Sequence, residues 1–312
     1  MKKLLTILLA LALILALPAL ADETAEVSTD EILSALGIGT YRNTYNALMA
    51  GEVVQKGTKS EAARGVQLTL AVFGQKLDVD GNAGPKTIEA LNAVQAAFGL
   101  PQTQVLDAKG YAELLRMLLI ADKPDVAADL LVDQFRPGEF EYLRACALQA
   151  KGKFAAAKLA FENCEYGDWM IRAATCVQPW PKTGVLYKNP QVSGSSTELT
   201  VKYNSDPEYA MLVKIYTLDN TLARTMFIAG NSKATTRLPA GTYIIKDGRG
   251  TEWFGEEDSF GENGSYEIMT FSDGEQTVQL KKNYSSTITV NVRDSDPSGD
   301  YVGSDYEDYG DF

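Results

Sequence analysis

The residue types that could carry out chemistry are limited, because the 312-residue chain contains no histidine. Ser-His-Asp catalysis, Cys-His catalysis and zinc sites built on imidazole are therefore excluded. Carboxylates remain, and Glu256, Glu257 and Asp258 form a consecutive run of them. Two carboxylates can hydrolyse a glycosidic bond when burial raises the pKa of one. Consecutive acids in a polar loop are usually solvated, so we predict no catalytic residues.

Oxygen donors also alternate along the polar loop 78–84. Asp78, Asp80 and Asn82 have the spacing that begins a calcium loop. The later acid that such a loop requires is replaced by Thr87. We therefore predict no metal site and no cofactor.

The same loop has a structural interpretation and a binding interpretation. Gly81 and Gly84 allow positive φ or a close backbone approach. Asp80 and Asn82 can bond nearby backbone N–H groups and hold a turn. For any single residue the sequence favours loop architecture, and direct contact with a ligand is the alternative.

Three short helices are predicted to position this loop. Apolar residues at helical spacing precede it, and Gly74 ends that helix. Pro85 opens the next helix, which Gly99 ends, and Asp107 is a suitable N-cap for the third. The three apolar faces consist of Ala63, Val66, Leu70 and Phe73; Thr87, Leu91, Val94 and Phe98; and Tyr111, Leu114, Leu115 and Leu118.

The loop and its flanks carry a family resemblance. The run V-D-G-N-A-G-P-K-T at 79–87 is followed by Leu91, Gln95 and Gly99-Leu100. Residues 54–120 resemble the peptidoglycan-binding domain family, whose pattern is a helix, a V-D-G-x-x-G-x-x-T loop, a helix ending in Q-x-x-x-G-L, and a third helix. That family usually begins the third helix with Asp-x-x-Thr and an aromatic residue, whereas this chain has Gly110 before its aromatic.

The resemblance implies that the ligand is peptidoglycan and that binding is non-covalent. The expected site is a shallow groove beside residues 80–87, in contact with the glycan or the stem peptide. The binding residues that it implies are Asp80, Gly81, Asn82, Gly84, Thr87 and Gln95.

Residues 122–177 are Ala-rich and are predicted to form a helical-hairpin spacer. Over 139–177 they resemble a tetratricopeptide-type unit. One unit and a fragment fall short of the roughly three repeats that a stable array needs. We therefore interpret the segment as a spacer packed on its neighbours, with a peptide-binding groove as the alternative.

Cys146, Cys164 and Cys176 all lie in this spacer. An odd number of cysteines leaves at least one unpaired. The parallel first and third helices of such a unit would place Cys146 level with Cys176, so this pair is favoured if a disulfide forms. Three buried thiols acting as small apolar residues are the alternative.

A stiff Pro-Trp-Pro linker at 178–183 precedes a strand-rich segment, 184–293. Regularly spaced apolar runs with Gly, Pro and Asp between them predict an antiparallel β-sandwich of about eight strands. The run 238–243 resembles the corner of a transthyretin-like module. The fold class is thus multidomain, α then β: a three-helix bundle within the helical domain 28–120, the hairpin spacer and the sandwich.

Aromatic residues gather on a long loop of this segment, at Trp253, Phe254 and Tyr266. Aromatic rings on a surface can stack on a sugar. The other interpretation is that these rings pin the loop to the sandwich, and the sequence favours it.

Residues 1–21 have the features of a secretory signal. Lys2 and Lys3 precede an apolar run from Leu4 to Leu17, and Ala19-Leu20-Ala21 is a small-x-small cleavage site. We therefore expect a secreted protein, extracellular or associated with the cell wall, with no stable membrane anchor after cleavage.

The net charge of −12 becomes −14 without residues 1–21, since 27 basic and 41 acidic residues remain. Half of that charge lies in the acidic tail 294–312, which has seven acids and no base and is predicted to be disordered. The charge argues against nucleic acid, anionic lipid and a polyanionic wall polymer as partners of the whole molecule.

The sequence thus predicts a secreted, non-catalytic peptidoglycan-binding protein that presents a β-sandwich of unknown ligand at the cell envelope. A protein partner could dock on the spacer or the acidic tail. Two other functions stay open: a carboxylate-dependent cell-wall hydrolase, and a structural or adaptor protein with a degenerate peptidoglycan-binding domain.

Overall fold

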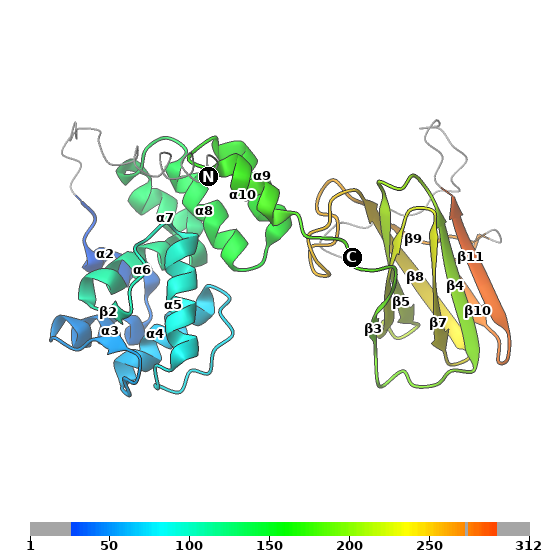
Figure 1. Cartoon of the computed structure of the whole chain (residues 1–312), viewed down its shortest axis with the longest axis horizontal. Helices are drawn as coiled ribbons and strands as arrows, with labels where there is room; N and C mark the ends of the chain where they lie inside the picture. Colours follow the sequence, from blue (N-terminus) through cyan, green and yellow to red (C-terminus); the bar gives the residue numbers. More distant parts are fainter. Residues whose placement is uncertain (1–25, 272–273, 292–312) are drawn as a thin grey trace, which may run out of the picture.

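The computed structural model describes residues 26–271 and 274–291, and within them a helical half is followed by a β half (Figure 1). This order confirms the α-then-β fold class. The predicted signal, 1–21, and the predicted acidic tail, 294–312, lie outside the described residues. In the part that the structure covers, every helix is too short or too polar to cross a membrane.

Two short β-strands and a series of helices make up the helical half. The predicted bundle is present as α4, α5 and α6, and α2 and α3 precede it. The elements are α2 (Thr29–Leu36), α3 (Gly39–Met49), β1 (Val54–Gln55), α4 (Glu61–Val72), α5 (Pro85–Ala97), β2 (Val105–Leu106), α6 (Ala108–Asp122), α7 (Pro124–Leu131), η1 (Val132–Gln134), α8 (Glu139–Ala150), α9 (Phe154–Cys164) and α10 (Trp169–Cys176).

The helix ends follow local signals. Ser60 caps α4 by accepting a hydrogen bond from the Ala63 N–H (3.1 Å), and Pro85 opens α5. Asp107 caps α6 through the Gly110 N–H (2.9 Å). A Cβ atom at Gly110 would lie 2.9 Å from Leu106 Cδ1. Glycine thus fits the close contact at this position, and the helix starts normally.

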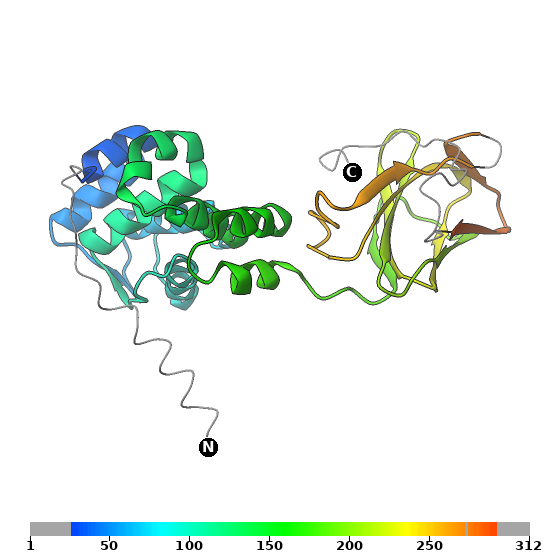
Figure 2. The ribbon, with the colours of Figure 1, turned by 90° about the horizontal axis from the view of Figure 1, so that it is seen from above.

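One apolar core runs through the whole helical half, from Ile32 to Cys176. Its centre is α6, which buries Leu114, Leu115 and Leu118 and packs against α2, α3, α4, α7 and α8. A helix that is apolar on most sides is stable when neighbours surround it. The spacer helices α8 to α10 therefore share their core with the bundle, and they extend toward the β half (Figure 2).

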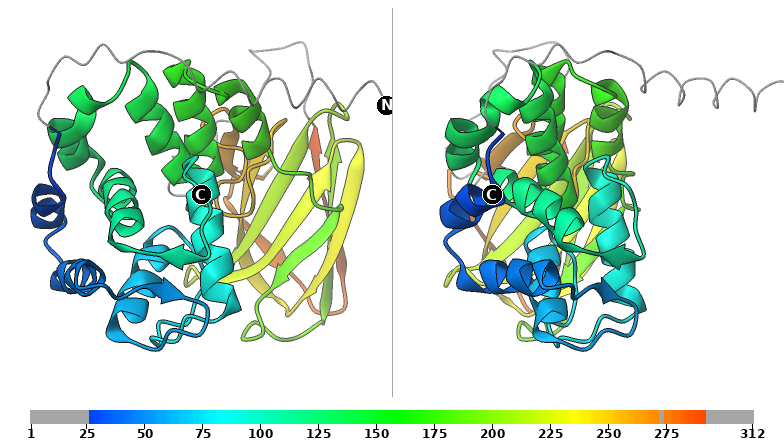
Figure 3. Two further views of the ribbon diagram at one scale, coloured as in Figure 1. Left: turned by 60° about the vertical axis from the view of Figure 1, so that its left-hand side comes forward. Right: turned by 90° about the vertical axis from the view of Figure 1, so that its left-hand side faces the viewer.

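The β half contains two sheets, which lie behind the helical half when the molecule is viewed along its long axis (Figure 3, right). The six-stranded sheet has the order β10-β8-β5-β6-β3, with β9 also paired to β8, and the three-stranded sheet has the order β11-β4-β7. Facing side chains of both sheets form one core, which includes Val201, Val213 and Ile228. The strands are β3 (Gly184–Lys188), β4 (Thr197–Asn204), β5 (Ala210–Thr217), β6 (Leu222–Ala229), β7 (Ser232–Leu238), β8 (Gly241–Gly250), β9 (Ser265–Ile268), β10 (Thr277–Leu280) and β11 (Ser285–Asn291).

The sheets are not wholly antiparallel as predicted, because β11 pairs with β4 in parallel. The reason lies in the larger sheet. β3 and β10 point the same way, since β6, β5 and β8 lie between them and each neighbouring pair is antiparallel. The chain crosses to the small sheet after β3 and again after β10, so β4 and β11 enter it in the same direction.

Candidate functional site

The predicted peptidoglycan-binding loop is organised by Gln67, a buried side chain of α4. Its Oε1 accepts a hydrogen bond from the Gly81 N–H (2.8 Å). Its Nε2 lies 3.0 Å from Asp80 Oδ1, 3.1 Å from the Asn82 carbonyl oxygen and 3.2 Å from Thr87 Oγ1. One amide therefore satisfies polar groups along the whole loop, as buried polar groups require.

The loop is held further by the Asp80 side chain and by backbone hydrogen bonds to residues 57–60. Asp80 Oδ1 also accepts from the Asn82 N–H (2.8 Å), and these two hydrogen bonds, from Asn82 and then Gln67, lower the pKa of Asp80. Gly81 adopts a φ of +78°, and a Cβ atom there would lie 3.0 Å from the Ser60 carbonyl oxygen. Glycine is therefore the residue that this turn accommodates without strain.

Only part of the predicted residue set is open to solvent. Asp80 and Asn82 are exposed and Gly84 is half-buried, whereas Gly81 and Thr87 are buried. Gln95 is buried as well, and it bonds Thr103 through both its Nε2 (3.1 Å) and its Oε1 (3.0 Å). The side chains of Thr87 and Gln95 thus hold the domain together internally. Gln67 is not among the predicted residues, although a long polar side chain beside the apolar stripe of α4 is a usable signal.

A cavity with room for a ligand lies elsewhere in the helical half, between α3 and the start of α6. It has a volume of about 540 Å³, within the range of small-ligand sites. None of its lining residues belongs to the loop 78–84. They are Tyr45, Leu48, Met49, Gly51, Glu52, Val53, Asp107, Ala108, Lys109 and Ala112.

The cavity combines an apolar wall with three charged side chains: Glu52, Lys109 and Asp107, the N-cap residue of α6. Leu48 is buried, while Met49 is 62% exposed at the rim. Glu52 Oε1 is buried and has no hydrogen-bond partner among the described residues. Lys109 is exposed, and in the described part of the chain no ion pair engages it. A buried acceptor without a donor is costly, so a ligand that donates to Glu52 would satisfy it.

Comparison with known proteins bears on this half of the chain. The family model described as "Putative peptidoglycan binding domain" matches residues 59–114. The resemblance predicted for residues 54–120 is confirmed. It supports peptidoglycan binding and association with the cell wall. Neither the curated proteins nor the solved structures compared with the chain gave a match.

The segment that matches the family model, residues 59–114, supplies one side of the cavity. Asp107, Ala108, Lys109 and Ala112 belong to it, at the start of α6. The opposite side comes from α3 and residues 51–53, which precede the matched segment. The cavity is therefore formed jointly by the matched segment and the preceding helix.

The aromatic residues of the β half do not form a sugar-stacking surface, contrary to that interpretation. Trp253, Phe254 and Tyr266 are only 3%, 6% and 4% exposed. Trp253 packs edge-on against Phe227 of β6, with ring centroids 5.2 Å apart. The loop 251–264 thus lies over the outer face of the larger sheet, pinned by its rings, which is the interpretation the sequence favoured.

Cys146 and Cys176, the pair that the sequence favours only if a disulfide forms, are not bonded in this structure. Both thiols and that of Cys164 are free and buried. The Cys176 Sγ lies within hydrogen-bond distance of Gln149 Nε2 (3.5 Å) and the Arg172 carbonyl oxygen (3.4 Å). Burial raises the pKa of Cys146 to about 12 and that of Cys176 to about 11. These cysteines act as small core residues.

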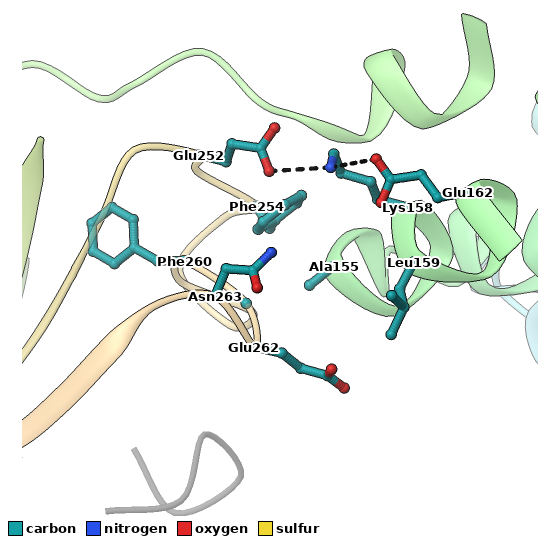
Figure 4. Close-up of a pocket in the computed structure, with 10 residues that line it drawn as sticks. Ala155, Lys158, Leu159, Glu162, Glu252, Phe254, Phe260, Glu262 and Asn263 are labelled. Carbon is teal, nitrogen blue, oxygen red and sulfur yellow. Dashed lines mark hydrogen bonds and ion pairs between the residues drawn. The ribbon is translucent and has the colours of Figure 1, made fainter. Parts of the chain in front are cut away.

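Two acids of the run Glu256–Asp258 connect the two halves of the molecule. The Asp258 carboxylate accepts a hydrogen bond from the Ala155 N–H of α9 (3.0 Å), and Glu257 forms an ion pair with Lys153. Nearby, Lys158 of α9 lies between Glu162 (2.7 Å) and Glu252 (3.3 Å) (Figure 4). The cavity at this junction measures about 50 Å³, well below the size of a ligand site.

A second group of acids is buried between the sheets of the β half. Asp247 has no exposed surface, and Arg249 Nη2 donates to it (2.6 Å) and to Glu267 (3.2 Å). Burial raises the pKa of Asp247 to about 6, although the Arg249 charge opposes the shift. One guanidinium thus bridges the two carboxylates inside the core.

Proposed function

We propose that this protein is a secreted, non-catalytic peptidoglycan-binding protein that uses no cofactor. Its helical half binds the wall polymer, and its β half is presented at the cell envelope. The family match of residues 59–114 is the observation that carries this proposal.

The cavity between α3 and α6 is the binding site in this proposal, in place of the loop 78–84. Glu52 offers an acceptor for an amine or amide N–H, and Lys109 offers a cation for a carboxylate. Tyr45, Leu48 and Met49 provide apolar contact between them. A stem peptide carries these three kinds of group, so it fits the cavity better than a glycan, whose hydroxyl groups need many polar partners.

A non-catalytic role is supported by the placement of the acids. Glu257 and Asp258 make contacts between the halves, and Asp247 and Glu267 share Arg249. A glycosidase pair needs one protonated and one ionised carboxyl group facing a substrate. Neither the α3–α6 cavity nor the junction cavity is lined by Asp247 or Glu267. The α3–α6 cavity does contain two carboxylates, Glu52 and Asp107, but Asp107 is engaged as the N-cap of α6 through the Gly110 N–H.

Co-sedimentation with insoluble peptidoglycan tests the proposal when release of soluble fragments is assayed in the same tube. We expect the protein to pellet without releasing fragments. Release would establish a hydrolase, and absence of both pelleting and release would favour an adaptor. A parallel sample of peptidoglycan from which the stem peptides have been removed should pellet much less protein. Equal pelleting would contradict the stem-peptide assignment.

A further inference from the structure

The outer face of the three-stranded sheet carries an ordered polar array. On β4 the side chains of Leu199, Val201 and Tyr203 are buried, so the alternate residues point outward. The strand register aligns these in rows across β7, β4 and β11. The rows are Arg237-Glu198-Ser285, Thr235-Thr200-Thr287 and Lys233-Lys202-Thr289.

This face is basic in an acidic protein. The three rows contain three basic residues, Arg237, Lys202 and Lys233, and one acid, although the chain has a net charge of −12. The acid, Glu198, pairs with Arg237 (3.4 Å). The net charge argued against polyanions as a whole-molecule effect, but a local basic face can still attract one.

Lys202 and Lys233 lie directly opposite each other on neighbouring strands. Both are exposed, and within the described residues neither has an ion pair or a side-chain hydrogen bond. Like charges directly opposite each other on a sheet are destabilising. An anion bound between the two ammonium groups would reverse that cost.

The neighbouring row supplies hydroxyl groups. Thr200 Oγ1 and Thr235 Oγ1 are 2.9 Å apart, and Thr287 follows on β11. Hydroxyl groups beside ammonium groups suit the oxygens of a phosphate group. The three rows contain no aromatic side chain on which a nucleobase could stack, so a base-free phosphate polymer fits better than a nucleic acid.

We infer that this face binds a linear, base-free phosphate polymer, with Lys202 and Lys233 as the main contacts and the threonine row beside them. The site is separate from the α3–α6 cavity. Only the location of such a polymer at the cell envelope rests on the proposed function. This face would give the β half a ligand of its own.

Fluorescence anisotropy of the full chain with labelled linear inorganic polyphosphate tests the inference across a range of salt concentrations. The double variant Lys202→Gln/Lys233→Gln should bind at least about tenfold more weakly at low salt. Its slope of log affinity against log salt should be smaller by about two, because two phosphate contacts are lost. The matched control Lys76→Gln/Lys182→Gln changes two exposed lysines elsewhere and should bind like the wild type.

Several outcomes would overturn the inference. These are an affinity of the double variant within twofold of the wild type, an equal loss in the control, or tighter binding of oligodeoxythymidine than of polyphosphate. A tenfold gain on deleting residues 294–312 would identify that acidic segment as the occupant. Peptidoglycan pelleting of the double variant should stay at the wild-type level, which separates this result from failure of the proposed function.

Discussion

The Asp258 carboxylate of the β half accepts a hydrogen bond from the backbone N–H of Ala155, in the first turn of α9. Lys153, the N-cap residue of α9, makes no side-chain cap hydrogen bond itself. Asp258 is buried and thus supplies a helix cap from the other half of the molecule. Asp258 and Glu257, two of the three consecutive acids, are thus contacts between the halves of the molecule.

Asp258→Ala should loosen the junction between the halves. Loss of a cap costs about 1 kcal/mol of stability. Small-angle X-ray scattering should report a larger radius of gyration, and a protease should cut the linker 178–183 faster. Glu256→Ala is the matched control, since Glu256 is exposed and engages in no ion pair within the described chain. Unchanged scattering in the Asp258 variant would contradict this role.

Gln67→Met should destabilise the helical half. The variant leaves the Gly81 N–H and the other loop groups without their partner, at a cost of about 1–3 kcal/mol. Urea unfolding followed by circular dichroism measures the change. Gln104→Met, at an exposed position, should have little effect. A loss below about 0.5 kcal/mol in the Gln67 variant would show that the loop does not depend on this amide.

Charge removal in the cavity should weaken peptidoglycan binding. Glu52→Gln replaces one carboxylate oxygen by an NH2 donor and removes the negative charge, and Lys109→Gln removes the positive charge. We expect each variant to pellet several-fold less protein at a fixed peptidoglycan concentration. Lys86→Gln, beside the loop 78–84, serves as the comparison. A greater loss of peptidoglycan binding in the Lys86 variant would indicate that the binding site is at the loop 78–84.

Stability should fall as the pH rises from about 4 to 7. The pKa of Asp247 is about 6 in the folded protein, above the ordinary aspartate value of 3.8, so between these two values the folded state holds a proton that the unfolded state has released. The contribution of Asp247 to the free energy of unfolding is fully present below its pKa in the unfolded chain. It is lost as the pH rises through 6, and the total loss is about 2–3 kcal/mol. No histidine titrates in this window, and the carboxylates with lowered pKa values, Glu31, Asp80 and Asp219, act in the opposite direction at lower pH. Urea unfolding of Asp247→Asn should show a flatter pH profile, and an identical profile would refute the assignment.

The three cysteines should not react with thiol reagents in the native protein. Burial and the raised pKa values of Cys146 and Cys176 keep their thiols protonated and enclosed. Iodoacetamide at neutral pH should therefore leave the native protein unlabelled. In guanidinium without reductant, mass spectrometry should find all three thiols labelled. Labelling of a single cysteine under those conditions would demonstrate a disulfide.

Local signals were readable in the sequence. Pro85, Gly99 and Asp107 mark helix ends as predicted, since each acts through its own backbone or its near neighbours. Periodicity also located most strands. The role of Gln67 was not readable, because its partners lie 13 to 20 residues further along the chain.

Long-range contacts set the other limits of prediction. Asp258 and Ala155 are 103 residues apart, and no local pattern pairs them. The cavity depends on how α3 meets α6, which side-chain packing decides. The parallel pairing of β11 with β4 likewise follows from the order of the whole larger sheet.

The parallel pairing of β11 with β4 delays completion of the small sheet until residues 285–291 have been synthesised. β4 is the central strand of the small sheet, yet its partner β11 is the last described strand to leave the ribosome. Until residues 285–291 emerge, one edge of β4 stays open to pairing with another chain. The helical half has its own core and can fold earlier. A chain that stops before β11 should therefore aggregate through its β half while its helical half is intact.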